Sequence, residues 1–255
     1  MTTILIGATG FVGSNLKQQI SFDALLSSKN IGDFQGQSVD LALVAAGDAR
    51  KWYANQNPEE DRAHIERVIA DISAININRV LHFSTVDVYA SKQGDETALA
   101  GQVSKDAYGG HRYLMELALR ERFSNVATIR LPGLYGPGLK KNIIFDLCQG
   151  RDLTGFNPDS AFQWFDLLEL RRIVDFIERT GLKELNVCAE PLTVAELLEG
   201  LDLSFERASP AAPLICYDIR TIHAAAFGAD GDYLYSKAQS LSGIRAFLSN
   251  LGQAA

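Results

Sequence analysis

Residues 2–13 read TTILIGATGFVG, and this stretch decides the fold. It opens with a short apolar run rich in strand-forming residues and continues without a break into Gly7, Gly10 and Gly13. Residues 11–20 then place apolar side chains at helical spacing, namely Phe11, Val12, Leu16 and Ile20. A strand, a glycine turn and a helix in this order predict a binding site for a dinucleotide.

Each glycine has a physical task in such a site. Gly7 permits a tight turn out of the strand, Gly10 lets the backbone approach a pyrophosphate, and Gly13 lets the helix pack close to the strand. The N–H groups of the first helical turn would then face the phosphates. The expected cofactor contacts in this stretch are Gly7, Thr9, Gly10, Phe11, Val12 and Gly13. The alternative is a plain turn between a strand and a helix.

Composition narrows the class of protein. The 255 residues, 47% of them hydrophobic, suffice for one α/β domain with a sizeable core. The formal net charge of −7 argues against nucleic acid as the main partner. The chain enters a strand directly rather than through a signal peptide, and its apolar runs are too short for a membrane span.

Cysteine and histidine usage points to a reducing compartment. Cys148, Cys188 and Cys216 are well separated, and we expect small buried hydrophobes rather than disulfide partners. The four histidines follow no zinc-ligand spacing. We therefore expect a cytoplasmic protein that binds no metal, no membrane and no nucleic acid.

Strand and helix patterns alternate over the first two-thirds of the chain. We expect strands at residues 23–27, 38–47, 79–85 and 126–131, and helices at 58–75 and 104–123, the second capped by Ser104. This alternation predicts an α/β fold, a Rossmann-type doubly wound parallel sheet. Ligands of such a sheet lie beyond the carboxyl ends of its strands. Ala45, Ala46 and Gly47 end one of these strands and are expected to contact the dinucleotide.

After Pro132 the regular alternation of strand and helix patterns ends. Helices are expected at residues 142–149, 167–179, 193–199 and 236–251, an extended segment at 185–188, and a linker-like break at 208–213. Thr193 and Glu196 form the sequence signature of a capping box. We interpret residues 1–255 as a single Rossmann-type domain. In it, residues 1–135 are mainly dinucleotide-binding and residues 136–255 are mainly a small C-terminal substrate-binding region interleaved with the sheet.

Four segments, in order, resemble one family. They are residues 7–13 (GATGFVG), 83–89 (FSTVDVY), 108–112 (YGGHR) and 130–138 (RLPGLYGPG). Together they resemble the extended short-chain dehydrogenases/reductases of the NAD-dependent epimerase/dehydratase type. The resemblance implies a Rossmann-type sheet, bound NAD(P), often a nucleotide-sugar substrate, and a homodimer that pairs through the long helix.

The resemblance assigns catalytic roles to Thr85, Tyr108 and Arg112. A hydroxyl such as that of Thr85 both donates and accepts, so it can follow an alcohol that becomes a carbonyl. Tyr108 would move a proton to or from the substrate oxygen. The family has a lysine where this chain has Arg112, one helical turn after Tyr108, and a cation there favours the phenolate and contacts the ribose. A surface pair is the alternative for these two residues. Lys105 and His111 are expected to face solvent.

Further positions follow from the same resemblance. Asp87 lies beside the pocket, either as an acid/base group or as a turn residue. Pro132 and Leu134 would pass under the nicotinamide, and Asn142 would contact substrate. Gln163 stands where the family often has an arginine that holds a diphosphate. Trp164 either stacks on a base or sugar or belongs to the core.

The choice between NAD and NADP depends on the end of the second strand. An NAD site favours an acidic residue there, and an NADP site favours small or basic groups. Asp23 comes too early, whereas Ser28 and Lys29 fit a 2′-phosphate. We therefore favour NADP, with a solvent-exposed loop lysine as the alternative for Lys29.

These features predict an NAD(P)-dependent oxidoreductase, epimerase or dehydratase that acts on a hydroxyl or keto carbon of a sugar, nucleotide-linked in the first hypothesis. The departures at Arg112, at Gly133, where the family often has an asparagine, and at Gln163 motivate an alternative, a dinucleotide-binding sensor or scaffold that has lost catalysis. A third hypothesis is a reductase for a carbonyl that carries no nucleotide.

Overall fold

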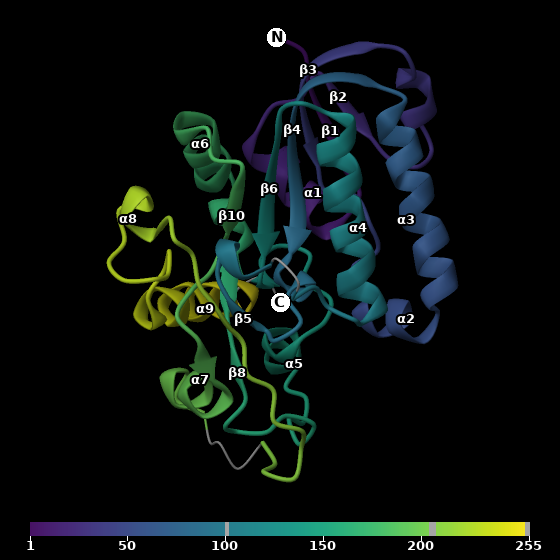
Figure 1. Ribbon diagram of the computed structural model, residues 1–255. Helices are drawn as coiled ribbons and strands as arrows, with labels where there is room; N and C mark the ends of the chain where they lie inside the picture. Colours follow the sequence, from purple (N-terminus) through teal and green to yellow (C-terminus); the bar gives the residue numbers. More distant parts are fainter. Residues whose placement is uncertain (100–101, 204–207, 253–255) are drawn as a thin grey trace. The chain divides into compact units, whose positions relative to one another are not determined.

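Six parallel strands form the main sheet (Figure 1). The first of them in the chain starts at residue 3. In order across the sheet they are β2 (Ala24–Leu26), β1 (Thr3–Ile6), β3 (Ser38–Val44), β4 (Asn76–Thr85), β6 (Val126–Leu131) and β10 (Glu184–Asn186). This confirms the predicted doubly wound α/β sheet. β3 is buried along nearly its whole length, which explains its continuous apolar run.

The computed structural model describes residues 1–99, 102–203 and 208–252. The chain divides into two units. The first holds the main sheet and comprises residues 1–91, 96–131 and 168–186. The second comprises residues 92–95, 132–167 and the described part of 187–255.

The strand order places a switch point between β1 and β3. The chain leaves β1 toward β2 on one side and then returns to β3 on the other side of β1. Ligands of doubly wound sheets bind at such a point, beyond the carboxyl ends of the strands. The ends of β1 and β3 carry Gly7 and Ala45, two residues of the predicted dinucleotide site.

Helices of the first unit pack in pairs. α1 (Phe11–Gln19) contacts α6 (Leu170–Thr180), and α3 (Pro58–Ser73) contacts α4 (Ala107–Arg122). Pro58 occupies the first turn of α3, where its missing N–H costs nothing, and three acidic residues follow it at the positive end of the helix dipole. Apolar side chains of the sheet, α3 and α4 form one buried core, including Ile4, Val44, Ile65, Ile72, Met115 and Leu119.

A buried ionic cluster joins β4, β6 and α4. Arg130 and Glu116 are both fully buried, and their side chains form two hydrogen bonds of 2.7 and 3.0 Å. The Ser84 hydroxyl donates to the same carboxylate at 2.6 Å. Since a buried charge is tolerated only when it is paired and hydrogen-bonded, these contacts fix how α4 sits on the sheet.

The second unit consists of short elements. Its three two-stranded sheets pair β7 (Gly133–Tyr135) with β9 (Trp164–Asp166), β8 (Ala161–Phe162) with β11 (Leu192–Thr193), and β5 (Gln93–Gly94) with β12 (Asp218–Ile219). Its helices are α5 (Ile143–Cys148), α7 (Val194–Gly200), α8 (Ala224–Phe227) and α9 (Lys237–Gly252). The predicted capping box is present, because Thr193 and Glu196 each bond the backbone N–H of the other.

Several boundaries differ from the prediction. The long helix begins at Ala107 rather than at residue 104, because the Ser104 hydroxyl accepts from the N–H of Asp106 in a turn that precedes the helix. Helix α2 (Lys51–Gln56) was not predicted at all. Cys188 is buried as expected, but Cys216 is exposed. Within the described ranges, no helix is both long and apolar enough to cross a membrane.

The buried His82 makes stability depend on pH. Burial lowers its pKa to about 3, and the nearby Arg120 and Arg130 cations act in the same direction. The unfolded chain binds a proton at an ordinary histidine pKa of about 6.5, so acid favours unfolding. We expect His82 to cost about 2 kcal/mol of unfolding free energy between pH 7 and pH 5. Denaturant unfolding of wild type and His82→Leu should show a shallower pH slope in the variant, and equal slopes would contradict this.

Candidate functional site

The glycine turn after β1 lies directly against the end of β3. Gly7 has a φ of +88°, and a Cβ there would stand 2.3 Å from the Ala45 carbonyl oxygen. A Cβ on Gly13 would stand 2.1 Å from the carbonyl oxygen of Gly7. Both positions therefore require glycine, for the turn and for the close approach of helix to strand. Gly10 is different, because a Cβ there would make only ordinary contacts.

The amino end of α1 fits a pyrophosphate. Gly10 is its N-cap residue and provides no side-chain cap, and the first turn contains no acidic residue. Thr9 and Gly10 are exposed, and Phe11 and Val12 are half-buried, so the helix end is accessible. An uncapped helix N-terminus with exposed N–H groups attracts an anion. On the facing strand end, Ala45 and Ala46 are half-buried and Gly47 is exposed.

The loop after β2 is held by an asparagine. Asn30 accepts from the N–H of Ser27 at 2.7 Å and donates to the carbonyl of Leu25 at 3.0 Å. Ser28 and Lys29 are both exposed on this loop. Asp23 accepts from the N–H of Thr3 at the start of β1, at the opposite end of the strands, and is therefore too distant to meet a ribose at this loop.

Thr85 and Asp87 stand where β4 ends. The Thr85 hydroxyl accepts from the N–H of Asp87 at 3.1 Å and caps the single turn of 3₁₀ helix that follows. Both side chains are half-buried. Because β4 lies next to β3, this strand end borders the switch point.

The start of α4 packs on that turn. A Cβ on Gly109 would stand 2.0 Å from the Asp87 carbonyl oxygen, so only glycine permits this approach. The first turn of α4, which carries Tyr108, therefore packs against the turn that contains Asp87.

Arg112 is one turn beyond Tyr108 and is buried. Its guanidinium carbon lies 4.2 Å from the centroid of the Tyr108 ring, a cation–π arrangement. Its two terminal nitrogens donate to the Asp61 carboxylate and to the Asp48 carbonyl. His111 Nδ1 lies 2.7 Å from the same carboxylate. The prediction that His111 faces solvent is therefore wrong. The guanidinium is therefore engaged inside the protein.

The Tyr108 phenol is protonated at neutral pH. Burial raises the pKa of Tyr108 to about 12, Arg112 opposes this rise, and the carboxylates of Asp87, Asp61 and Asp48 add to it. A neutral phenol is a proton donor rather than a base.

Helix α2 contributes two contacts that sequence reasoning missed. Lys51 Nζ lies 2.5 Å from Asp87 Oδ1, and Asn55 Oδ1 accepts from the N–H of Tyr108 at 3.0 Å. The two residues are four apart and so lie on one face of the helix. With six residues and no apolar periodicity, this helix gave no sequence signal.

The other predicted residues belong to the second unit. Pro132 and Leu134 are half-buried, Leu134 within β7. Asn142 has a φ of +120°, a strained value for a residue with a side chain. Its amide donates to the Leu134 carbonyl at 2.8 Å and accepts from the N–H of Phe145 at 3.0 Å, and both bonds offset that strain.

Gln163 and Trp164 are buried in the second unit. The Gln163 amide donates to the carbonyls of Ala189 and Ile219 and accepts from the N–H of Ile219, so it ties three chain segments together. Trp164 is 6% exposed and belongs to the core of this unit. Its ring would lie 2.9 Å from a Cβ on Gly133, which explains glycine at that position.

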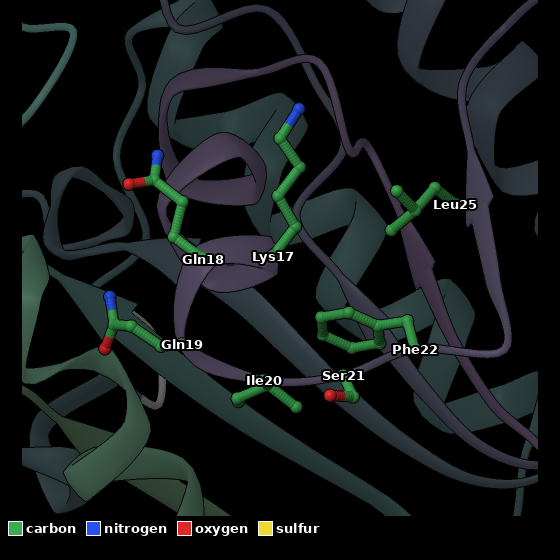
Figure 2. A pocket seen from close by; sticks show the side chains of 7 residues that line it. All are labelled: Lys17, Gln18, Gln19, Ile20, Ser21, Phe22 and Leu25. Carbon is green, nitrogen blue, oxygen red and sulfur yellow. The ribbon is translucent and has the colours of Figure 1, made fainter.

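A hollow of about 370 Å³ lies elsewhere on the first unit (Figure 2). It surrounds the carboxyl end of α1 and the start of β2, where Lys17, Phe22 and Leu25 line it. The predicted dinucleotide residues are at the amino end of α1, so this hollow contains none of them. Over the residues that the structure describes, no group of three His, Cys, Asp or Glu side chains is arranged to hold a metal ion.

No family model and no curated protein matches this chain. Solved structures do match it. A dTDP-4-dehydrorhamnose reductase from Bacillus anthracis in complex with NADP has a TM-score of 0.74 at 14% identity, over 98% of this chain and 100% of that one. A UDP-glucuronic acid 4-epimerase from Bacillus cereus in complex with NAD has a TM-score of 0.71 at 16% identity, over 99% and 97%.

A third structure is a UDP-N-acetylglucosamine 4-epimerase from Methanobrevibacter ruminantium in complex with UDP-N-acetylmuramic acid. It has a TM-score of 0.74 at 12% identity, over 100% of this chain and 99% of that one. At such identities the likeness shows the fold. The chain therefore has the fold that its resemblance to the extended short-chain dehydrogenases/reductases predicted.

Proposed function

We propose that this protein is an NAD(P)-dependent oxidoreductase or epimerase that acts on a hydroxyl or keto carbon of a sugar. The observation that carries the proposal is the packing of the first turn of α4, which carries Tyr108, on the turn of Thr85 and Asp87 at the carboxyl end of β4. The fold neighbours, which include a sugar-nucleotide reductase and two epimerases, support the same class.

The cofactor would bind along the carboxyl edge of the sheet. Gly7, Gly10 and the first turn of α1 would hold its pyrophosphate, Ala45, Ala46 and Gly47 would line the facing wall, and Ser28 and Lys29 would contact a 2′-phosphate. When bound, NADP(H) supplies or accepts the hydride. The absence of an acidic residue from the loop at residues 27–30 supports NADP over NAD.

Thr85 would orient the reacting oxygen, and Tyr108 would carry the proton. A phenol that is neutral at physiological pH suits donation to a carbonyl oxygen as an alcohol forms. The Gln163 amide is occupied by backbone groups, so it is unsuited to the diphosphate contact that the family's arginine makes at this place. A nucleotide-linked sugar remains our proposed substrate class, with its diphosphate held by other groups.

The cysteines, which form no disulfide in the described chain, support a cytoplasmic location.

Dinucleotide binding is testable with two glycine variants. Gly10→Ala should leave the unfolding free energy within about 0.5 kcal/mol of wild type but weaken NADPH binding roughly tenfold, because a methyl group enters the pyrophosphate approach. Gly13→Ala should lose about 2 kcal/mol or more of stability through the clash with Gly7. Titration calorimetry and denaturant unfolding measure both effects. Tighter binding of NADH than NADPH to wild type would refute the preference for NADP.

Turnover should depend on the Tyr108 phenol. With NADPH and a panel of 4-keto and 4-hydroxy nucleotide-sugars, Tyr108→Phe should lower kcat about 100-fold or more, because the proton donor is gone. Tyr113→Phe, on the same helix, is the matched control and should keep wild-type turnover. Equal turnover by Tyr108→Phe would exclude the role. Tight NADPH binding without turnover on any carbonyl substrate would favour the sensor or scaffold instead.

We further propose a homodimer that pairs through α4. Leu117 lies on this helix and is 45% exposed, an apolar side chain available to a second copy. Light scattering should give twice the chain mass for wild type and a single chain for Leu117→Arg. A wild-type monomer at micromolar concentration would contradict the proposal.

A further inference from the structure

Arg112 does not present its charge to the phenol oxygen as a lysine ammonium would. Its guanidinium lies over the face of the Tyr108 ring, and its terminal nitrogens are bonded to Asp61 and to the Asp48 carbonyl. Asp61 is buried and balances the arginine charge. Burial raises the pKa of Tyr108, and the opposing effect of Arg112 does not cancel that rise.

Asp87 brings a negative charge to the same phenol. Its backbone touches the first turn of α4 at Gly109, and its carboxylate raises the pKa of Tyr108. A carboxylate beside a phenol opposes loss of the phenol proton and disfavours the phenolate left after proton transfer. A cation paired with Asp87 offsets this repulsion.

Lys51 supplies that cation from a different helix. Its ammonium lies 2.5 Å from Asp87 Oδ1, and Asn55, on the same face of α2, holds the N–H of Tyr108. One short helix therefore contacts both the carboxylate and the residue that carries the phenol. The Lys51 side chain is 35% exposed and that of Asp87 is 18% exposed, so solvent screens this pair less than a pair on the open surface.

We propose that Lys51 is a positioning residue for Tyr108, which acts by neutralising the carboxylate of Asp87, whose backbone packs against the first turn of α4. The effect of Lys51 on catalysis rests on the proposed function, whereas its effect on the pKa of the Tyr108 phenol does not. The balanced proton transfer is the one already described: the phenol O–H bond breaks, the proton goes to the substrate oxygen, and a phenolate remains. Lys51 makes that phenolate less costly because Asp87 repels it less.

The other charged groups around Tyr108 already have partners of opposite sign. Arg112 from α4 is paired with Asp61 from α3, which His111 also contacts. Asp48, in the segment before α2, is bonded to Arg50, which lowers the pKa of Asp48. Replacing Lys51 therefore removes one positive charge from the surroundings of the phenol and leaves these two pairs in place.

A site-specific titration in the cofactor-free protein tests the inference. A fluorinated tyrosine at position 108 lowers the intrinsic phenol pKa into the pH range where the protein is folded, and its phenolate is followed by absorbance. In this background Lys51→Met should raise the phenol pKa by about one pH unit. Lys51→Arg should restore the parent value, and the exposed-lysine control Lys105→Met should not shift it. Lys51→Gln replaces Lys51→Met if the latter does not fold.

A double variant tests the route through Asp87. If Lys51 acts by neutralising this carboxylate, Lys51→Met should have no effect once Asp87→Asn is present. A shift of equal size in both backgrounds, or no shift from Lys51→Met in the parent, overturns the inference. Neither result depends on turnover, whereas an active Tyr108→Phe protein overturns the proposed function and leaves the titration unaffected.

Discussion

The contact between the turn after β1 and the end of β3 is the constraint on which the dinucleotide side depends. Gly7 stands against the Ala45 carbonyl, and Gly13 stands against the Gly7 carbonyl, in both cases closer than any side chain permits. Three backbone segments therefore meet without side chains between them. Because β1 and β3 flank the switch point, this packing directs the open end of α1 to the edge where a ligand of the sheet lies.

The proposed catalytic side depends on a second constraint, the buried ionic cluster under α4. Glu116 is held by Arg130 and Ser84, and it follows Tyr108 by eight residues, roughly two helical turns. A helix that is fixed in rotation at Glu116 is also fixed at Tyr108. The cluster is thus a means of aiming the phenol, while the pair's net contribution to stability is modest, as expected of buried ion pairs.

Local sequence signals predicted the helices whose start is determined by residues within or next to the helix itself. The glycine spacing gave α1, the proline and acidic residues gave α3, and the Thr193–Glu196 pair gave the start of α7. Helix α2 was not predicted because it is held by packing on α3 and α4 and by the ion pair of Lys51 with Asp87, rather than by a pattern of its own.

The candidate site divides in the same way. The order of strands and helices predicted that the motifs of Thr85 and Tyr108 lie at the carboxyl ends of the strands, and in the structure α4 packs on the turn after β4. The partners of Arg112 and Gln163 were not predictable, because these polar side chains bond to groups distant in sequence, Arg112 to Asp61 and Gln163 to Ile219. The contact of His111 with the buried Asp61 was not predictable for the same reason, since nothing near His111 in sequence indicates it.

The arginine at position 112 and the proposed lysine from another helix differ in what their cations can do. A guanidinium is planar, stacks on a ring and has five donors, so it bonds Asp61 and the Asp48 carbonyl and links α3, α4 and the segment before α2. An ammonium is a compact charge, which Lys51 brings to Asp87 from α2. In the family pattern, tyrosine and lysine share one helix and keep a fixed spacing. Here Tyr108 is on α4 and Lys51 is on α2, and the bond between Asn55 and the Tyr108 N–H joins the two helices. The electrostatic effect of Lys51 on the phenol therefore depends on how α2 packs on α4.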